Sequence, residues 1–406
     1  MRILQIIPSI SLVYGGPSQM VLGLSAALAA KNIDVTIITT DSNGDIGQLP
    51  LDVPLNEPIQ KNGYQIIYFR CYPWRRYKFS FSLLQWLNEN ARQFDLAHIH
   101  ALFSPVTTLA ATIARYHKLP YIMRPCGMLD PADLQKKKRL KQIYATLLER
   151  PNLVGAAAIH FTSKEEAKIS ERFGLGSTGK MLVPRDLVIP LGVTAGLFPK
   201  RLPESHVPII LFMSRIEPKK GLDLLIPALE SILVSGVEFH FILAGSNPQD
   251  ADYETQIKVQ IYNSRLAKYT TITGFVSGDL KVKLLTKADL FVLPSYYENF
   301  GLAVAEAMAA GVPVVISDRI HIAEDIQQTE AGWVGPLEVG AIANSIKSAL
   351  LNPQERQRRG LNGKEYAKKH YNWEAIAQQT IDAYQQILSS IAEVRWKSEE
   401  GRRKKQ

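Results

Sequence analysis

Short runs of β-branched and aliphatic residues alternate with helical stretches along most of the chain. This order is typical of α/β proteins, in which each strand of a parallel sheet is followed by a helix that crosses back over the sheet. The series of strands starts twice, once in each half of the chain. We expect strands at residues 2–8, 35–40, 95–100 and 157–162, and then at 208–214, 239–244, 271–275, 290–294 and 313–317.

The break between the two series is marked by the four prolines from Pro190 to Pro208. A chain of 406 residues is long enough for two domains, each with its own core. We therefore predict an α/β fold of two Rossmann-like, doubly wound domains that face each other across a cleft. The predicted parts are a first domain at 1–195, a second domain at 205–372, a helix at about 374–394 that packs back on the first domain, and a basic tail at 395–406.

Composition excludes several classes of protein. With 46% hydrophobic and 21% charged residues, the chain is an ordinary globular protein. Its 2 cysteines are too few for a disulfide scaffold, no Cys/His cluster has zinc spacing, and no apolar run has the length of a membrane span. We expect a cytoplasmic protein.

The net charge of +9 is distributed unevenly. Basic residues are concentrated at Lys136–Lys141 and in the last twelve residues of the chain. Both segments fit either a solvated surface or contact with anionic lipid headgroups, which would make the protein peripheral on the inner face of the cell membrane. No nucleic-acid-binding motif accompanies the charge, so we expect no nucleic acid partner.

Two phosphate-binding fingerprints are absent. No GxGxxG motif follows the first strand, which disfavours an NAD-dependent oxidoreductase. Gly174–Lys180 fits the GxxxxGK pattern, but Met181 stands where a P-loop needs Ser or Thr, and a helical stretch precedes the motif instead of a strand. We interpret this segment as a surface loop.

A basic turn follows the first strand of the second domain. Arg215 and Lys220 lie between the end of this strand and the start of the next helix. Arginine offers a bidentate fork and lysine a compact charge, so the pair is suited to hold a diphosphate.

Two carboxylates follow a later strand of the same domain. Glu298 lies in a loop, and Glu306 comes eight residues later, inside an alanine-rich helix. Carboxylates accept hydrogen bonds from sugar or ribose hydroxyls, and the amides that open this helix can bind a phosphate. A buried Glu306 would be unfavourable without a polar partner.

Together these segments resemble the retaining nucleotide-sugar glycosyltransferases of family 4. The resemblance is carried by Ser214–Gly221, by the E-x7-E pattern from Glu298 to Glu306, and by Gly311-Val-Pro-Val-Val315. The first domain is similar to the same family through Gly15-Gly16-Pro17 and the segment 95–100. The resemblance implies the GT-B fold, with the donor held mainly by the second domain.

The resemblance also implies roles for individual residues. Arg215 and Lys220 would hold the donor diphosphate, Glu306 the ribose, and Glu298 the transferred sugar. His100 would touch the sugar and support catalysis, although His98 faces the same side of the strand. The implied catalytic residues are His100, Glu298, Arg215 and Lys220, and the implied donor-binding residues are Gly15, Gly16, Arg215, Lys220, Gly245, Phe275, Glu298, Asn299, Phe300, Gly301, Leu302 and Glu306.

A further segment is similar to a subgroup of this family that assembles polysaccharides. It begins at Met123-Arg-Pro-Cys-Gly-Met-Leu129 and is followed by the lysine run. By this resemblance Arg124, Lys136 and Lys137 would meet a saccharide or lipid-diphosphate acceptor. A plain loop with an exposed basic helix is the alternative.

The expected function is hexosyl transfer with retention, from a UDP- or GDP-sugar to a saccharide or lipid-linked acceptor in polysaccharide or glycoconjugate synthesis. No cofactor and no metal is expected, because Arg215 and Lys220 would supply the positive charge. The alternatives are a sugar epimerase on the same fold, a non-catalytic sugar-binding homologue and an NAD-dependent dehydrogenase. The sequence leaves the sugar, the nucleotide base and the acceptor open.

Overall fold

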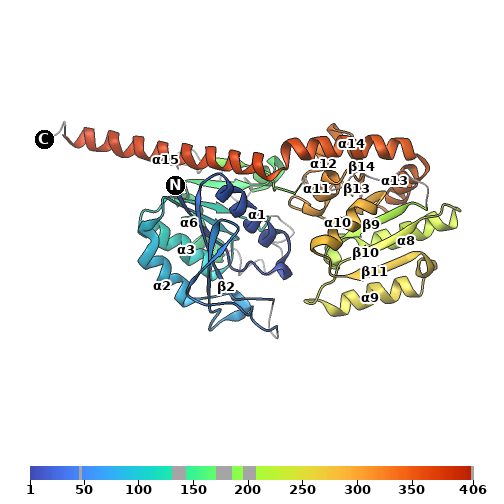
Figure 1. Cartoon of the computed structure of the whole chain (residues 1–406), viewed down its shortest axis with the longest axis horizontal. Helices are drawn as coiled ribbons and strands as arrows, with labels where there is room; N and C mark the ends of the chain where they lie inside the picture. The colour runs from blue at the N-terminus through green and yellow to red at the C-terminus, as the bar shows by residue number, and fades with distance from the viewer. Residues whose placement is uncertain (45–47, 130–142, 171–184, 195–206, 404–406) are drawn as a thin grey trace. The chain divides into compact units, whose positions relative to one another are not determined.

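A computed structural model describes residues 1–44, 48–129, 143–170, 185–194 and 207–403 of the chain. The chain divides into two compact units (Figure 1). Unit 1 comprises Met1–Gly192 and Trp373–Gln406, and unit 2 comprises Val193–Asn372. Unit 1 is therefore discontinuous in sequence, because the chain leaves it, forms unit 2 and returns.

The described strands of unit 1 form one eight-stranded sheet in the order β3-β4-β2-β1-β5-β6-β7-β8. β3 is antiparallel to its neighbour, and the other pairs are parallel. The strands are β1 (Arg2–Ile6), β2 (Asp34–Thr40), β3 (Pro58–Lys61), β4 (Tyr64–Phe69), β5 (Leu96–His100), β6 (Tyr121–Arg124), β7 (Ala158–Phe161) and β8 (Arg185–Val188).

Helices cover both faces of this sheet. The described helices of unit 1 are α1 (Gly16–Ala30), α2 (Phe81–Asn90), α3 (Pro105–Tyr116), α6 (Arg150–Gly155), α7 (Lys164–Ser170) and α15 (Trp373–Arg403). Alternation along β5 separates the two faces: Ala97 and Ile99 join an apolar core with α2 and α3. His98 and His100 point to the opposite face, where Tyr384 of α15 lies.

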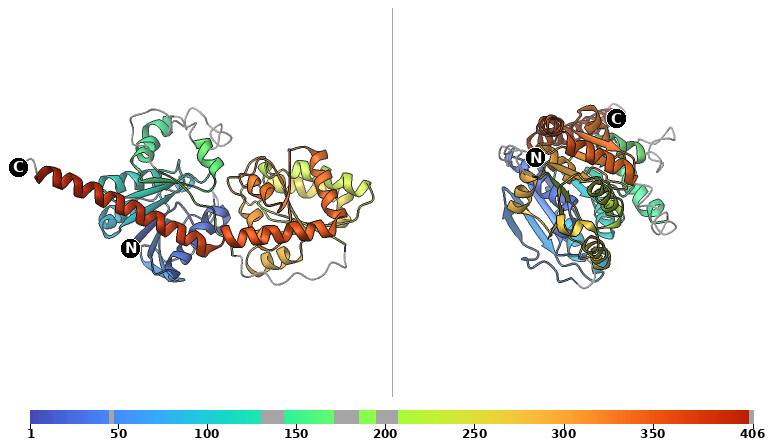
Figure 2. Two further views of the ribbon diagram at one scale, coloured as in Figure 1. Left: turned by 90° about the horizontal axis from the view of Figure 1, so that it is seen from above. Right: turned by 90° about the vertical axis from the view of Figure 1, so that its right-hand side faces the viewer.

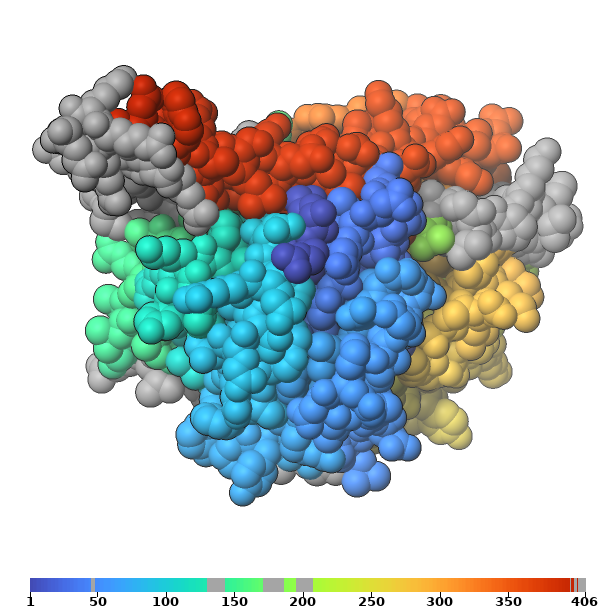
Figure 3. All heavy atoms as spheres, turned by 60° about the vertical axis from the view of Figure 1, so that its left-hand side comes forward, coloured from blue at the N-terminus to red at the C-terminus, as the bar shows by residue number. Residues whose placement is uncertain are grey.

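Helix α15 returns to unit 1 through a close contact at its first residue. The ring of Trp373 lies so near to Gly23 and Gly192 that a Cβ atom at either glycine would stand 2.2 Å from a ring carbon. The helix then runs along α1, and Figure 3 shows its side chains lying against those of the N-terminal segment. It continues to Arg403, beyond the end that we expected near residue 394. Figure 2 shows these last turns extending past the rest of unit 1.

Unit 2 has a six-stranded parallel sheet in the order β11-β10-β9-β12-β13-β14. This is the 3-2-1-4-5-6 order of dinucleotide-binding domains, and it reverses direction between β9 and β12. Its elements are β9 (Ile209–Met213), α8 (Leu222–Val234), β10 (His240–Ala244), α9 (Ala251–Tyr262), β11 (Thr270–Gly274), α10 (Gly278–Lys287), β12 (Leu290–Leu293), α11 (Leu302–Ala309), β13 (Val314–Ser317), α12 (Ala323–Gln328), β14 (Gly332–Gly335), α13 (Val339–Leu351) and α14 (Pro353–His370).

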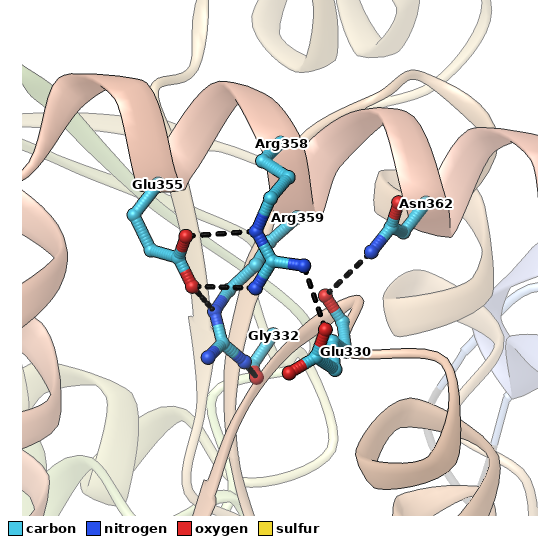
Figure 4. A network of polar contacts seen from close by, with 6 residues as sticks. All are labelled: Glu330, Gly332, Glu355, Arg358, Arg359 and Asn362. Carbon is cyan, nitrogen blue, oxygen red and sulfur yellow. Dashed lines mark hydrogen bonds and ion pairs between the residues drawn. The ribbon is translucent and has the colours of Figure 1, made fainter.

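A network of charged side chains fastens α14 to the start of β14 (Figure 4). Arg358 binds Glu330 at 2.6 Å and Glu355 at 2.7 Å, and Arg359 contacts Glu355 at 2.8 Å and the carbonyl of Gly332. Hydrogen bonds from Arg358 and Arg359 lower the pKa of Glu355 to about 2. Because these charged groups already have partners, we interpret this cluster as structural.

No helix in the described part of the chain is both long enough and apolar enough to cross a membrane.

Candidate active site

The candidate site of unit 2 lies where the strand order reverses. β9 and β12 are neighbours in the sheet. The strands that follow β9 in sequence are added on one side of this pair, and the strands that follow β12 are added on the other side. The loops after such a pair diverge, so the carboxyl edge between them is the usual ligand site of this fold. Arg215 and Lys220 follow β9, and Glu298 follows β12. The fold thus brings the two sequence motifs of the second domain together.

An ion pair joins the two loops. The Nζ atom of Lys220 donates a hydrogen bond to Oε1 of Glu298. Both side chains are nearly buried, with 9% and 13% of their surface exposed. Gly221 makes this approach feasible, because it adopts a φ of 72° and a Cβ atom there would stand 2.0 Å from the carbonyl oxygen of Pro294.

Positive charge is in excess around this pair. Oε1 of Glu217 lies 3.1 Å from a guanidinium nitrogen of Arg215, 3.6 Å from Nζ of Lys219 and 3.9 Å from Nζ of Lys220. Three cations therefore share two carboxylates, those of Glu217 and Glu298. Such an excess, with the fork of Arg215 partly exposed, is suited to bind phosphate oxygens.

Electrostatics keeps the Glu298 carboxyl ionised. Burial raises its pKa, but the charges of Lys220 and Lys219 outweigh burial and hold the pKa below the usual range. Burial also lowers the pKa of Lys220, and the charge of Glu298 offsets this only in part. An ionised Glu298 can only accept hydrogen bonds, which is what recognition of sugar hydroxyls requires.

The loop after Glu298 leads into α11 through a fixed backbone. The amide of Glu298 donates to Arg319 O at 3.3 Å, and the ring of Phe300 packs edge-on against that of Tyr371 at 5.2 Å. Gly301, with a φ of 80°, is the N-cap residue of α11. Glycine has no side chain that could accept a hydrogen bond from the first amides of the helix. The amides that begin at Leu302 are therefore available to an anion. Asn299 lies in the same loop.

Glu306 lies inside α11 and has a partner that sequence reasoning missed. Lys281 of α10 donates to its Oε1 atom at 2.6 Å. This contact explains how an alanine-rich helix tolerates a mostly buried carboxylate. The signal in the sequence is weak, because Lys281 is one of several lysines on α10.

Gly245 and Phe275 directly follow β10 and β11, at the same edge of the sheet. A Cβ atom at Gly245 would stand 1.8 Å from the carbonyl oxygen of Ser214, so only glycine fits between the loops after β9 and β10. Phe275 follows β11, and its ring is more than half exposed.

In unit 1, the predicted glycines open α1. Gly15 has a φ of 72°, and Gly16 is the first residue of the helix. A Cβ atom at either position would meet nothing within 4 Å, so the backbone is open to a ligand there. These glycines follow β1, and His100 ends the neighbouring β5, on the two sides of the point where this sheet also reverses.

His100 belongs to a buried polar layer on one face of the sheet. Its Nε2 atom lies 2.6 Å from Oε1 of Gln5, and its ring stacks on that of His98 at 4.4 Å. His98 contacts Tyr384 at 2.7 Å and His160 at 3.2 Å. Burial lowers the pKa of His98 and His100 well below the usual range and that of His160 to about 3, so the three rings are neutral.

The direction of each hydrogen bond in this layer follows from one carbonyl group. His160 donates from Nε2 to Ile189 O at 2.9 Å, so its Nδ1 atom must accept from His98. Nδ1 of His98 then accepts from the Tyr384 hydroxyl, and Gln5 donates to that hydroxyl at 3.4 Å. The Gln5 carbonyl accepts from Nε2 of His100. His100 therefore presents the lone pair of Nδ1, which has no partner in the described structure.

The predicted acceptor residues lie at and beyond the end of β6. Arg124 is the last residue of this strand, pairs in register with His100 and is 3% exposed. Lys136 and Lys137 lie outside the described residues. Within the described residues, no group of three or more His, Cys, Asp or Glu side chains could hold a metal ion.

Comparison with known proteins identifies the class. Residues 15–185 match the family model of the glycosyl transferase 4-like domain, and residues 197–366 match that of the glycosyl transferases group 1. The chain therefore belongs to the group 1 glycosyltransferases. This confirms the family and the enzyme class that the sequence predicted.

Curated relatives carry the same assignment. Glycogen synthase of Mycobacterium tuberculosis is 24% identical over 401 residues, which cover 92% of this chain and 91% of that protein. An uncharacterized glycosyltransferase of Methanocaldococcus jannaschii is 34% identical over 180 residues, which cover 43% of this chain and 44% of that protein. The alignment with the archaeal protein thus spans less than half of its length.

Solved structures confirm the fold. Sucrose-phosphate synthase of Thermosynechococcus elongatus has a TM-score of 0.75 and 23% identity, with 96% of this chain and 100% of that chain covered. HepE of Anabaena, in complex with UDP-glucose, has a TM-score of 0.73 and 19% identity over 96% and 100% of the two chains. The chain has the GT-B fold of these enzymes.

Proposed function

We propose that this chain transfers a sugar from a nucleoside-diphosphate sugar to a saccharide or lipid-linked acceptor, with retention of the anomeric configuration and without a metal ion. The observation that carries the proposal is the ion pair of Lys220 and Glu298 at the reversal point of unit 2, with Arg215 beside it. The junction of a diphosphate and a sugar presents anionic oxygens next to hydroxyl groups. A phosphate-binding cation in direct contact with a hydroxyl-binding carboxylate is complementary to it.

The cations act on the leaving group. When the bond between the anomeric carbon and the diphosphate breaks, negative charge develops on the phosphate oxygens. Arg215, Lys220 and the first amides of α11 are fixed in place before the reaction, so they stabilise this charge without reorganising. This positive charge is the reason for proposing that no metal is used.

Glu306 binds the nucleotide ribose in this proposal. Lys281 holds one oxygen of its carboxylate, which leaves the other oxygen to accept from a ribose hydroxyl. HepE of Anabaena was solved with UDP-glucose, so UDP is the first nucleotide to test.

The acceptor binds unit 1 in this proposal, near His100 and Arg124. Nδ1 of His100 can only accept a hydrogen bond, so it would bind a sugar hydroxyl as a neutral acceptor and would not donate a proton. Contact of the protein with an anionic membrane surface is supported by the end of α15, where Val394 and Trp396 are exposed beside basic residues.

The test is a thermal-shift panel with UDP, GDP, ADP, NAD and ATP in the presence of EDTA. We expect one nucleoside diphosphate to stabilise the wild type and Lys369→Ala, a control at an exposed lysine of α14. In Lys220→Ala and Glu306→Gln its affinity should fall about tenfold or more, because each loses a charged hydrogen bond. Binding of NAD alone, or unchanged affinity in both site variants, would contradict the proposed donor site.

Retention and metal independence have their own readouts. With the nucleotide identified, transfer from the corresponding sugar donor is expected to proceed in EDTA and to give a product with the donor's anomeric configuration by proton NMR. An inverted product, or activity that requires added Mg²⁺ or Mn²⁺, would overturn these parts of the proposal.

A further inference from the structure

A buried cation at the end of β6 has no carboxylate partner among the described residues. Arg124 is 3% exposed, yet its Nε and Nη1 atoms donate no hydrogen bond there. Buried charges in proteins are normally paired, because an unpaired charge loses its hydration without compensation. The Nε and Nη1 donors of Arg124 are therefore available to a ligand.

Within the described residues, no carboxylate pairs with Arg124. Glu166 belongs to a neighbouring segment, but its Oε1 atom accepts from Gly127 at 3.0 Å and its Oε2 atom accepts from Thr162 at 2.7 Å. The neighbours of Arg124 are instead neutral groups: its charge contributes to lowering the pKa of His100, and its side chain hydrogen-bonds the Cys126 thiol, which opposes the effect of burial on the pKa of that thiol.

The hydrogen-bond acceptor of the polar layer that has no partner is Nδ1 of His100, which lies on β5, next to β6. His100 and Arg124 pair in register on β5 and β6, so their side chains leave the same face of the sheet. Other members of the layer satisfy one another, as described above, and the chain of hydrogen bonds ends at Nδ1 of His100. A free acceptor and free donors thus lie side by side at the carboxyl edge.

The loops that follow these two strands hold an unusual backbone conformation. Ala101, Phe103 and Cys126 have positive φ angles of 76°, 54° and 56°. Residues other than glycine seldom occupy this left-handed region, and such positions cluster at functional sites. This observation is independent of the unpaired side-chain atoms and points to the same edge of the sheet.

We propose that Arg124 and His100 form a binding site for an oxyanion, a phosphate or carboxylate group carried by the acceptor. The guanidinium fork binds the anionic oxygens, and Nδ1 of His100 accepts from a hydroxyl of the same ligand. The inference rests on the proposed function and adds the charge of the acceptor to it. Both groups are buried, so binding requires a shift of the loops 101–104 and 125–129.

Inorganic phosphate is the probe, and thermal unfolding at constant ionic strength is the measurement. All variants are made in a Lys220→Ala parent, in which phosphate binding at the proposed donor site is weakened. Arg124→Met is compared with Arg115→Met, a control at an exposed arginine of α3 that donates to Pro151 O at 2.7 Å. We expect a saturating rise in melting temperature in the parent and in the control, and at least a tenfold weaker response in Arg124→Met.

The melting temperature without phosphate separates a binding role from a structural one. Because Arg124→Met removes a buried charge that has no carboxylate partner among the described residues, the variant should melt at or above its parent. A lower melting temperature with a retained phosphate response, or an equal response in all variants, overturns the proposal. Should Arg124→Met fail to fold, Arg124→Lys keeps the charge without the fork, and an unchanged phosphate response in that variant also overturns it.

Two further comparisons identify the source of the anion in the wild type. Tighter binding of glucose 6-phosphate than of glucose, lost in Arg124→Met, assigns the site to the acceptor. Tighter binding of UDP-glucuronate than of UDP-glucose, lost in the same variant, assigns it to the donor and overturns our assignment. Binding of UDP by Arg124→Met reports on the donor site alone, so failure of this inference and failure of the proposed function are distinguishable.

Discussion

Lys219 and Lys220 are adjacent in sequence but differ sharply in environment, and this difference predicts a large difference in their contribution to stability. Lys220 is nearly buried and bonded to Glu298, whereas Lys219 is 29% exposed and lies 3.6 Å from Glu217. Removing one partner of a buried pair costs about 3–5 kcal/mol, while an exposed pair contributes about 0–1 kcal/mol. Arg215 and Lys219 remain near Glu298 when Lys220 is lost, so we expect about 3 kcal/mol for Lys220→Met.

Scanning calorimetry of the full chain measures this difference. In a folding unit of this size each kcal/mol shifts the melting temperature by about 2–4 °C, so the transition of unit 2 should fall by about 6–12 °C in Lys220→Met and by less than about 4 °C in Lys219→Met. The double variant Lys220→Met/Glu298→Leu should recover part of the loss, because it leaves no unpaired charge. Equal shifts in the two lysine variants, or a double variant that loses the sum of both single changes, would refute the reasoning.

Three further predictions concern stability. Gly221→Ala should destabilise the protein more than Gly236→Ala. Both glycines have a left-handed φ, which costs about 1–2 kcal/mol for alanine, but of the two only Gly221 would place the new Cβ atom against a backbone oxygen, at 2.0 Å. Equal urea midpoints of the two variants would contradict this. Tyr384→Phe should cost about 1–3 kcal/mol by leaving a buried histidine without its donor, whereas Tyr116→Phe, at a 79% exposed residue, should change nothing measurable in the same urea titration. The pKa of His160 is about 3 in the folded chain, so the unfolded state binds its proton first as the pH falls below about 6.5, and the stability due to the neutral ring is lost from there down to about 3. His160→Gln should therefore reduce the slope of unfolding free energy against pH in this window by up to about 1.4 kcal/mol per pH unit, and an unchanged slope would show that the ring does not titrate as inferred.

The strands β1, β2, β5, β7 and β9 to β13 could be predicted because each is a short apolar run of its own, whereas β3, β4, β6, β8 and β14 were missed. The order of the motifs predicted the family. Alternation along β5 also predicted that His98 and His100 share a face. The partner Tyr384 could not be predicted, because it lies 286 residues from His98 and no sequence pattern links the two positions. Lys281 was missed for a related reason: several lysines follow one another along α10, and only packing decides which one meets Glu306.

The return of the chain to unit 1 has a consequence for biosynthesis. A ribosome releases unit 2 in one continuous stretch, Val193–Asn372, whereas unit 1 lacks α15 until the residues that follow unit 2 have been made. Until then Gln5 and His98 are without the Tyr384 hydroxyl, and Gly23 without the ring of Trp373. The first half of the chain to be made is therefore the last to be completed, so a nonsense mutation before α15 would leave unit 2 whole and the nascent unit 1 open to chaperones and proteases.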